Sequence, residues 1–263
     1  MSLKDRNAII YGGGGSIGRA VAKAFARDGA RVFLTGRTRE TLDAVAAEVA
    51  AAGGQASVAV VDALDEQAVD EHARAVVAEA GSIDVSLNLI SRGDVQGTPL
   101  IEMATADFVG PITTGITSSF ITARVAGRQM VEQGSGVILA LDSGSGAKGS
   151  PMMGATGPAD AALDMFVRNL AMEIGPSGAR ALGIWVAGIP ETLSPEKLAQ
   201  ANSALQLDDA GVQGLISQLD QLRMTRRSPR LDEVADTIAF LASDRAAGIT
   251  GTFVNVTGGM FAS

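Results

Sequence analysis

The strongest constraint on the fold of this chain is an alternation of two kinds of segment along its whole length. Short runs of β-branched and other apolar residues alternate with longer, alanine-rich runs that repeat apolar residues at helical spacing. This alternation is typical of repeated strand–helix–strand units, which build a parallel sheet covered by helices on both faces. The sequence therefore predicts an α/β fold with one doubly wound, parallel sheet of seven strands.

The expected elements follow one another regularly, except in residues 190–229. Strands are expected at 8–11, 31–35, 57–61, 85–90, 137–141, 180–186 and 252–256. Helices are expected at 17–28, 39–52, 66–80, before about Gln133, at 158–175 and at 231–242. In residues 190–229, Ser194-Pro195 and Asp208-Asp209 have the form of helix starts, which predicts two short helices outside the sheet as a lid. A chain of 263 residues fits a single domain, here 1–263.

Composition argues against several classes of partner and site. With 29 acidic and 21 basic side chains, the formal charge is -8, and a surface of that sign repels nucleic-acid phosphates and anionic membranes. The chain has no cysteine and one histidine, His72, so neither a disulfide nor a metal site is expected. No run approaches the roughly 18 apolar residues of a membrane span, and no signal-sequence pattern is visible. We expect a cytoplasmic protein that binds a small-molecule substrate.

A glycine-rich loop directly follows the first expected strand. Tyr11 is succeeded by Gly-Gly-Gly-Gly-Ser-Ile-Gly, and the next helix begins within this loop. Glycines at a strand-to-helix turn permit positive φ and let backbone N–H groups approach a pyrophosphate, while the helix N-terminus attracts an anion. This position predicts a dinucleotide site, with a plain tight turn as the alternative. The predicted cofactor-binding residues of the loop are Gly12, Gly14, Gly15, Ser16, Ile17 and Gly18.

This loop resembles that of the short-chain dehydrogenase/reductase family, which reads Thr-Gly-x-x-x-Gly-Ile-Gly. Gly12, Ile17 and Gly18 stand at matching places, and Ser16 replaces the middle glycine. The resemblance continues through Arg180 to the closing Ile-Thr-Gly at 249–251 and Val-Thr-Gly-Gly at 256–259. It implies a single Rossmann-type dinucleotide-binding domain with a small lid, an oxidoreductase acting on a carbonyl or alcohol, and assembly as a homodimer or homotetramer.

The residues after the second strand indicate which nicotinamide cofactor is preferred. Gly36 and Arg37 stand where a dinucleotide fold contacts the adenosine ribose. A guanidinium there matches the 2′-phosphate of NADP(H), so we expect NADP(H) more than NAD(H). Alternatively, Arg37 and Arg39 are ordinary solvated arginines at a helix start. The resemblance adds Asp62, which would contact the adenine but can equally be a turn residue, and further implies Ala63 and Asn88 as cofactor-binding residues.

The catalytic positions depart from the family pattern. The family has a serine after the fifth strand and, thirteen residues later, Tyr-x-x-x-Lys, in which tyrosine exchanges the proton while lysine lowers its pKa and holds the nicotinamide ribose. Here the serine is Ser143, but Thr156 replaces the tyrosine and Asp160 the lysine. The only tyrosine is Tyr11, so no shift of the alignment restores the pair. Ser143, Thr156 and Asp160 are the catalytic candidates, and we also expect Thr156 to cap the helix starting near Pro158.

Two further family positions have changed. The family's Asn-Asn-Ala-Gly after the fourth strand reads Asn88-Leu89-Ile90-Ser91, and the asparagine of its fourth helix falls at Gly115. Asn88 and Ser143 are retained. The resemblance therefore supports the cofactor site more strongly than the catalytic one.

Three functions remain open at this level. The first is an NADP(H)-dependent oxidoreductase with an unconventional proton donor, such as a water held by Ser143, an acid on the substrate, Lys148 or Asp142. The second is a catalytically inactive cofactor-binding or regulatory protein on the same fold, which the missing pair favours. The third is a hydration or isomerisation with Asp160 or Asp142 as the base. The use of this family as oxidoreductases favours the first.

Overall fold

A seven-stranded parallel sheet runs through the computed structural model, which describes residues 2–260. The strand order is β3-β2-β1-β4-β5-β6-β7, and every neighbouring pair is parallel. The strands are β1 (Asn7–Tyr11), β2 (Arg31–Gly36), β3 (Gln55–Val60), β4 (Val85–Asn88), β5 (Gly136–Asp142), β6 (Ala179–Trp185) and β7 (Phe253–Asn255). The doubly wound sheet expected from the sequence is confirmed.

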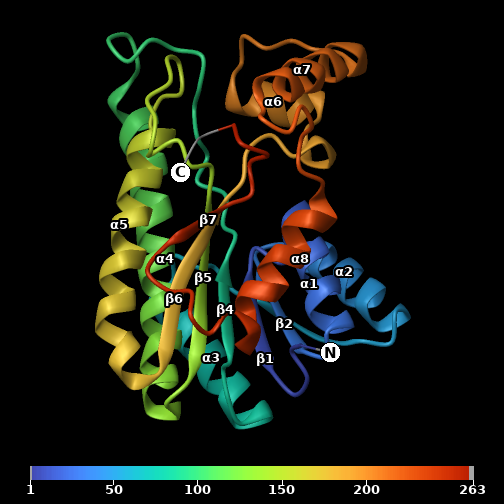
Figure 1. The fold of residues 1–263 in the computed structure, drawn as a ribbon, viewed down its shortest axis with the longest axis vertical. Coiled ribbons are helices and arrows are strands. Elements are labelled where there is room, and N and C mark those ends of the chain that lie inside the picture. Colours follow the sequence, from blue (N-terminus) through green and yellow to red (C-terminus); the bar gives the residue numbers. More distant parts are fainter. Residues whose placement is uncertain (1, 261–263) are drawn as a thin grey trace.

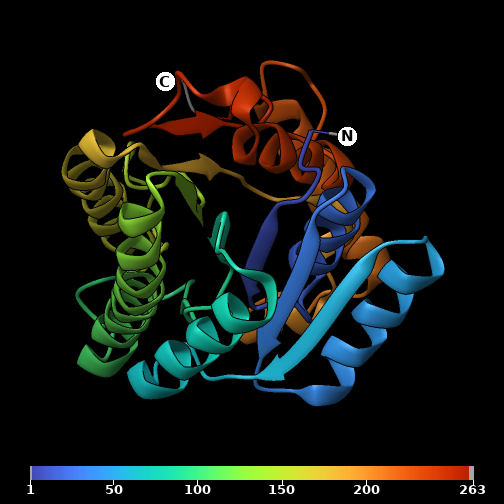
Figure 2. The same ribbon diagram turned by 90° about the horizontal axis from the view of Figure 1, so that it is seen from below.

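Helices cover both faces of this sheet (Figure 1 and Figure 2). They are α1 (Ser16–Arg27), α2 (Arg39–Ala51), α3 (Glu66–Ala80), α4 (Thr105–Gln133), α5 (Thr156–Ile174), α6 (Pro195–Ala201), α7 (Asp209–Leu222) and α8 (Leu231–Ala242). One buried apolar cluster joins the sheet to α1, α2 and α8, and a second joins it to α3, α4 and α5. Alternate residues of a strand face opposite sides, so Ile10 enters the first cluster and Ile9 the second.

The strand order reverses between β1 and β4. The chain adds β2 and β3 on one side of β1, then returns to place β4 on its other side. Crevices at the carboxyl ends of strands, at such a reversal, are where open α/β sheets bind ligands. The glycine loop lies at this point because it directly follows β1.

The lid consists of α6 and α7, which lie outside the sheet near the carboxyl ends of the strands (Figure 1). Both expected helix starts are confirmed, since Ser194 Oγ accepts from Lys197 N and Asp208 Oδ1 accepts from Gly211 N. α7 is longer than the short helix that was expected, at 14 residues.

A buried arginine fastens the end of the lid to the sheet. Arg223 is 1% exposed and donates from Nε to the carbonyl oxygen of Thr257 at 2.9 Å. It also donates from Nη1 to the carbonyl oxygen of Leu219 and from Nη2 to that of Ala187. These bonds tie α7 to the loops that follow β6 and β7, so the base of the lid has a defined position.

The expected start of α5 was wrong. The helix begins at Thr156, its N-cap is Ala155, and no side chain caps it. The turn from Met153 to Thr156 and the bond from Ala159 N to Ala155 O start the helix two residues early. Pro158 then lies within the first turn, where its missing N–H is not needed. Thr156 is therefore the first residue of the helix, and its hydroxyl has another contact.

The bounds of α3 and α8 are as expected, and the other boundaries lie within two residues of expectation. β4, for example, ends at Asn88 instead of 90, because Asn88 Oδ1 accepts from Ile90 N at 2.9 Å and turns the chain. None of the helices within residues 2–260 is long and apolar enough to cross a bilayer.

Candidate active site

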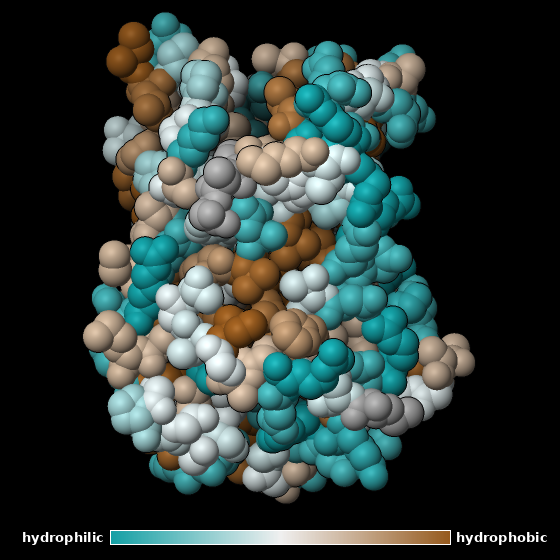
Figure 3. Space-filling model, in the orientation of Figure 1, coloured by the Kyte–Doolittle hydropathy of each residue, from teal (hydrophilic) through white to brown (hydrophobic). Residues whose placement is uncertain are grey.

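Two adjacent cavities open at the carboxyl edge of the sheet. The β2 cavity, of about 350 Å³, reaches the ends of β2 and β3, and the β5 cavity, of about 390 Å³, lies between β4, β5, α5 and the lid. The space-filling view shows a notch at this end of the molecule, beside the lid (Figure 3). Both cavities are lined by Gly12, Gly15, Leu89, Ile90 and Ser91, so a long ligand can extend across the glycine loop from one to the other.

The glycine loop has the close backbone packing that a phosphate-binding turn requires. Gly12 has a φ of 80°, and a Cβ there would lie 2.7 Å from the carbonyl oxygen of Leu89. A Cβ at Gly18 would lie 2.6 Å from the carbonyl oxygen of Gly12. Gly15 is the N-cap of α1 and makes no side-chain cap, so the N–H groups of the first helical turn face the shared part of the cavities.

The β2 cavity contains the residues expected to hold an adenosine. Arg37, Asp62 and Ala63 all line it, together with Thr38 and Thr41. Arg37 makes no ion pair with any residue in the described part of the chain, so its guanidinium is available to an anion. Asp62 Oδ1 accepts from Leu64 N at 3.0 Å, which supports its alternative reading as a turn residue without occupying its second oxygen.

The structure brings together Ser143 and Asp160. Asp160 is completely buried, and its Oδ2 accepts from the Ser143 hydroxyl at 2.5 Å, from Ser143 N at 3.2 Å and from Ser145 N at 3.0 Å. Its Oδ1 accepts from Arg92 Nη1 at 2.7 Å. The Ser143 hydroxyl also lies 2.7 Å from Ser145 Oγ and accepts from Ser145 N at 3.3 Å, so its hydrogen bonds are made within the protein and not to the cavity.

Sequence reasoning missed Arg92, which comes from the loop after β4 and lines the β5 cavity. Besides Asp160, it binds Asp94 Oδ2, through Nε at 3.2 Å and Nη2 at 3.1 Å. Burial by itself would lower the pKa of Arg92, but Asp94 and Asp160 outweigh it and raise that pKa. The only available signal was its place four residues beyond Asn88, at the carboxyl end of a strand.

Gly115, in α4, makes room for Arg92. A Cβ at Gly115 would lie 2.5 Å from Arg92 Cδ and 3.0 Å from Arg92 Cγ. Glycine is the residue that accommodates the arginine in this position without a clash. Arg92, Gly115 and Asp160 therefore form one local arrangement.

Thr156 lies apart from the cavity. It is 3% exposed, it is absent from the lining of the β5 cavity, and its Oγ1 accepts from Gln96 Nε2 at 3.3 Å. Lys148 is exposed and lines neither cavity.

Asn88 does line the β5 cavity, and its Nδ2 donates to Ser118 and Thr122, which holds the turn after β4 in shape.

Asp142 lines the β5 cavity as a buried acid. Its Oδ1 accepts from Gly144 N at 2.8 Å. Its Oδ2 is buried and has no hydrogen bond of normal geometry among the described residues, but the Asp164 carboxyl is close enough to influence the pKa of Asp142. Burial, with the neighbouring charges of Asp160 and Asp164, raises the pKa of Asp142 to about 9. Asp142 is therefore protonated at neutral pH.

Within residues 2–260, no group of three or more acidic or histidine side chains has the arrangement of a metal site.

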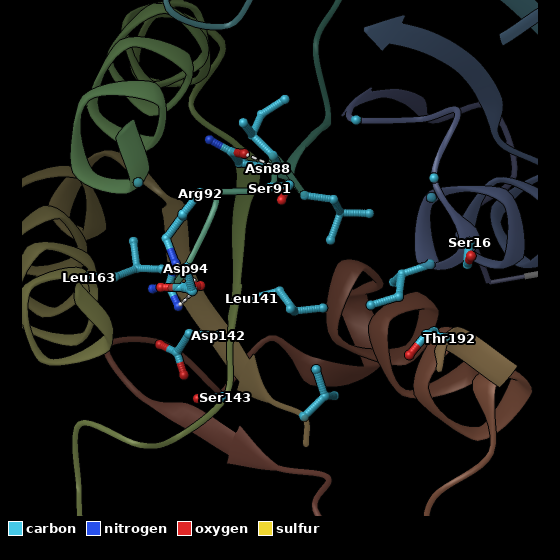
Figure 4. A pocket seen from close by; sticks show the side chains of 18 of the residues that line it. Ser16, Asn88, Ser91, Arg92, Asp94, Leu141, Asp142, Ser143, Leu163 and Thr192 are labelled. Atoms are coloured by element: carbon cyan, nitrogen blue, oxygen red, sulfur yellow. Dashed lines mark hydrogen bonds and ion pairs between the residues drawn. The ribbon is translucent and has the colours of Figure 1, made fainter. Parts of the chain in front are cut away.

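The opposite side of the β5 cavity is formed by α1 and the lid. Figure 4 shows Arg92, Asp94, Asp142 and Ser143 on one side, with Ser16 and Thr192 facing them across the hollow. Lys197, from α6, donates from Nζ to Ser16 Oγ at 3.2 Å. This lysine was also missed from the sequence, because it is 181 residues from the loop that it contacts.

The comparisons with known proteins cover nearly the whole chain. Residues 13–261 match the family model described as enoyl-(acyl carrier protein) reductase. The chain is similar to the L-rhamnose 1-dehydrogenase (NAD(P)(+)) of Azotobacter vinelandii, at 31% identity over 99% of this chain and 98% of that protein. It is also similar to the 3-oxoacyl-(acyl-carrier-protein) reductase of Escherichia coli, at 28% identity over 99% of each.

Solved structures give the same result for the fold. A NAD+-bound xylitol dehydrogenase superposes with a TM-score of 0.87 at 25% identity, covering 98% of this chain and 100% of the other. Levodione reductase superposes with a TM-score of 0.87 at 27% identity, covering 97% of each chain.

Proposed function

Because this chain belongs to the short-chain dehydrogenase/reductase family of oxidoreductases, we propose that it is an NADP(H)-dependent member acting on a small carbonyl or alcohol with an unconventional proton donor. The main support for this proposal is the glycine loop at the start of α1. The loop lines two adjacent cavities, and the residues expected to contact an adenosine line one of them.

The described residues fit a nicotinamide dinucleotide. Gly12 and Gly18 leave no room for a Cβ, and the N–H groups of the first turn of α1 would bind the diphosphate. When bound, such a cofactor supplies or accepts the hydride. The remaining loop contacts would come from Gly14, Gly15, Ser16 and Ile17, with Asp62 and Ala63 beside the adenine and Asn88 shaping the β5 cavity.

The preference for NADP(H) rests on Arg37. The protein of Azotobacter vinelandii is named for both NAD and NADP, and the xylitol dehydrogenase binds NAD, so these relatives leave the preference open. Arg37 lines the β2 cavity without an ion-pair partner within residues 2–260, and a guanidinium stabilises a 2′-phosphate by charge and by paired hydrogen bonds.

Asp142 is the proton donor that fits the proposal best. Among the groups considered from the sequence, Ser143 gives its proton to Asp160 and Lys148 lies outside the cavities, whereas Asp142 lines the β5 cavity and carries a proton at neutral pH. In a reduction, a bound cofactor would supply the hydride to the carbonyl carbon, and Asp142 would protonate the oxygen that takes up the electron pair of the C=O bond. Solvent then returns a proton to Asp142.

The decisive experiment is calorimetric titration of the protein with NADPH and with NADH. We expect both to bind and NADPH to bind more tightly, and binding of neither would overturn the proposed function. A panel of small ketones, aldehydes and sugars with NADPH then tests turnover by absorbance. Cofactor binding without turnover of any carbonyl would instead support an inactive cofactor-binding protein, the second function considered from the sequence.

We further propose that the chain folds as one domain and assembles as a homodimer or homotetramer through α4 and α5. These helices border an apolar hollow whose lining includes Phe120, Val131, Phe166 and Leu170. Phe120 is 45% exposed and Val131 is 41% exposed in the single chain, which leaves large apolar side chains for an interface. Light scattering at micromolar concentration tests this, and a monomer would contradict it. The cytoplasmic location stays a prediction.

A further inference from the structure

We propose that Arg92 is a cofactor-binding residue, whose two remaining N–H groups donate to oxygen atoms of the nicotinamide riboside half. This inference rests on the proposed function and adds a residue that neither the glycine loop nor the family pattern indicates.

Arg92 has donors left for a ligand. A guanidinium carries five N–H groups, and in Arg92 three of them donate to carboxylate oxygens of Asp94 and Asp160. Among the described residues, one N–H on Nη1 and one on Nη2 have no acceptor. The Arg92 side chain is only 13% exposed and lines the β5 cavity. These two N–H groups therefore have little contact with bulk water and are available to a ligand in the cavity.

Asp94, Gly115 and Asp160 form a socket that holds Arg92 in one position. The two carboxylates fix the guanidinium from different elements, since Asp94 follows β4 and Asp160 lies in the first turns of α5. Gly115, in α4, leaves the space that the Cγ and Cδ atoms occupy. A residue that only filled space would not need an ion pair with a completely buried carboxylate, because such pairs are costly to desolvate.

The relative position of the two cavities indicates that the part of the cofactor beside Arg92 is the nicotinamide half. Arg37 and Asp62 place the adenosine in the β2 cavity, and the helix N-terminus beside Gly15 places the diphosphate between the cavities. The rest of a dinucleotide then extends into the β5 cavity, past Arg92. Asp94 and Asp160 together carry more negative charge than Arg92 balances, so the site favours neutral hydroxyl and amide oxygens over an anion.

Neighbouring hydroxyls do not replace this donor. The Ser143 hydroxyl donates to Asp160, and the Thr156 hydroxyl is outside the lining of the β5 cavity. Asn88 Nδ2 is directed to Ser118 and Thr122. Among the described residues on this side of the cavity, Arg92 is therefore the donor with a permanent positive charge.

The test compares two ligands that differ in the nicotinamide half. NADPH contains both halves, whereas 2′,5′-ADP contains only the adenosine half with its 2′-phosphate. Calorimetry on the wild type is expected to show tighter binding of NADPH. Equal affinity for the two would overturn the inference while leaving the adenosine site, and binding of neither would overturn the proposed function itself.

Two variants remove the contact in different ways. Arg92→Met with Asp160→Asn removes both charges and avoids leaving a buried carboxylate unpaired. Gly115→Ala keeps both charges and displaces the arginine, and Gly110→Ala in the same helix is its control, since nothing lies within 4 Å of a Cβ at Gly110. Circular dichroism and thermal melting check that each variant is folded, and Gly115→Ala tests the inference should the double variant not fold.

We expect NADPH to bind about 10- to 100-fold more weakly to Gly115→Ala and to the double variant, as for the loss of one hydrogen bond from a charged group. The affinity for 2′,5′-ADP should stay within about twofold in every variant, and Gly110→Ala should bind both ligands like the wild type. Equal weakening of the two ligands, or unchanged NADPH affinity in a folded variant, would show that Arg92 has a structural role alone.

Discussion

The guanidinium of Arg92 donates from Nη1 to Oδ1 of Asp160 at 2.7 Å, joining two residues that are 68 positions apart. Asp160 has no exposed surface, and within residues 2–260 its hydrogen-bond donors are Arg92, Ser143 and Ser145. The pair connects the loop after β4 to the start of α5, so it fixes the spacing of the walls of the β5 cavity.

Asp160→Ala should therefore lower the free energy of unfolding. Arg92 keeps Asp94 as a partner, but the buried N–H groups of Ser143 and Ser145 lose the carboxylate that they donate to, which typically costs about 1 to 3 kcal/mol. The control is Asp43→Ala, which breaks the exposed pair with Arg39 and should cost at most about 0.5 kcal/mol. Urea unfolding at pH 7 measures both. Similar losses in the two variants would contradict a special role for the buried pair.

Arg37→Ala should weaken NADPH binding and leave NADH binding unchanged. The lost interaction with the 2′-phosphate is a charge-assisted hydrogen-bonded pair, worth about 1.5 to 3 kcal/mol. Arg39→Ala is the matched control, because Arg39 pairs with Asp43 and does not line the β2 cavity. Calorimetry with both cofactors provides the measurement. If the wild type binds NADPH and NADH equally well, the assignment of Arg37 is wrong.

Lys197→Met should weaken NADPH and NADH to the same extent. Lys197 reaches Ser16 at the start of α1, where a diphosphate would lie, and both cofactors share that group. An exposed cation there should contribute about 1 kcal/mol, or roughly fivefold in affinity, and less at high salt. Lys23→Met serves as the control, since Lys23 pairs with Glu48 away from the β5 cavity. Loss of affinity for NADPH alone would mean that Lys197 contacts the 2′-phosphate instead.

Asp142→Asn should make the protein more stable at pH 8, and the difference should shrink as the pH falls toward 4. Burial and the neighbouring Asp160 and Asp164 raise the pKa of Asp142 to about 9, so the native state binds one more proton than the unfolded state between about pH 4 and pH 9. Folding stability therefore declines as pH rises through that window in the wild type. Asparagine removes this term, which amounts to about 5 kcal/mol at pH 8, at roughly 1.4 kcal/mol for each pH unit above the unfolded pKa. Urea unfolding from pH 4 to 8 measures it, and identical pH profiles would refute it.

The same residue predicts the pH dependence of turnover. If Asp142 donates the proton, carbonyl reduction should be fast while it is protonated and should fall above about pH 9. Asp142→Asn should retain NADPH affinity and lose about 10²- to 10⁴-fold in kcat. Steady-state kinetics with NADPH over pH 6 to 10 provide the readout. Unchanged kcat in Asp142→Asn would assign the proton to water or to the substrate.

Local patterns determined the fold and the position of the glycine loop. The alternation of strand and helix periods, the glycines after β1 and the helix starts at Ser194 and Asp208 depend on residues close together in the sequence, and each agrees with the structure. The predicted start of α5 near Pro158 was wrong, because it was judged from the same kind of local pattern. The turn at Met153 began the helix earlier than Thr156 and Pro158 suggested, and a side-chain cap was not needed.

Tertiary structure alone decided which groups meet in the β5 cavity. Arg92 and Asp160 are 68 residues apart, and Lys197 and Ser16 are 181 residues apart, so no local pattern connects them. The arginine reaches Asp160 because Gly115, on a third element, leaves the necessary space. The sequence determined where the strands end and where the glycine-rich turn lies, because those features follow from backbone geometry. The donors and acids that face the ligand follow from packing between distant elements, which only the folded chain specifies.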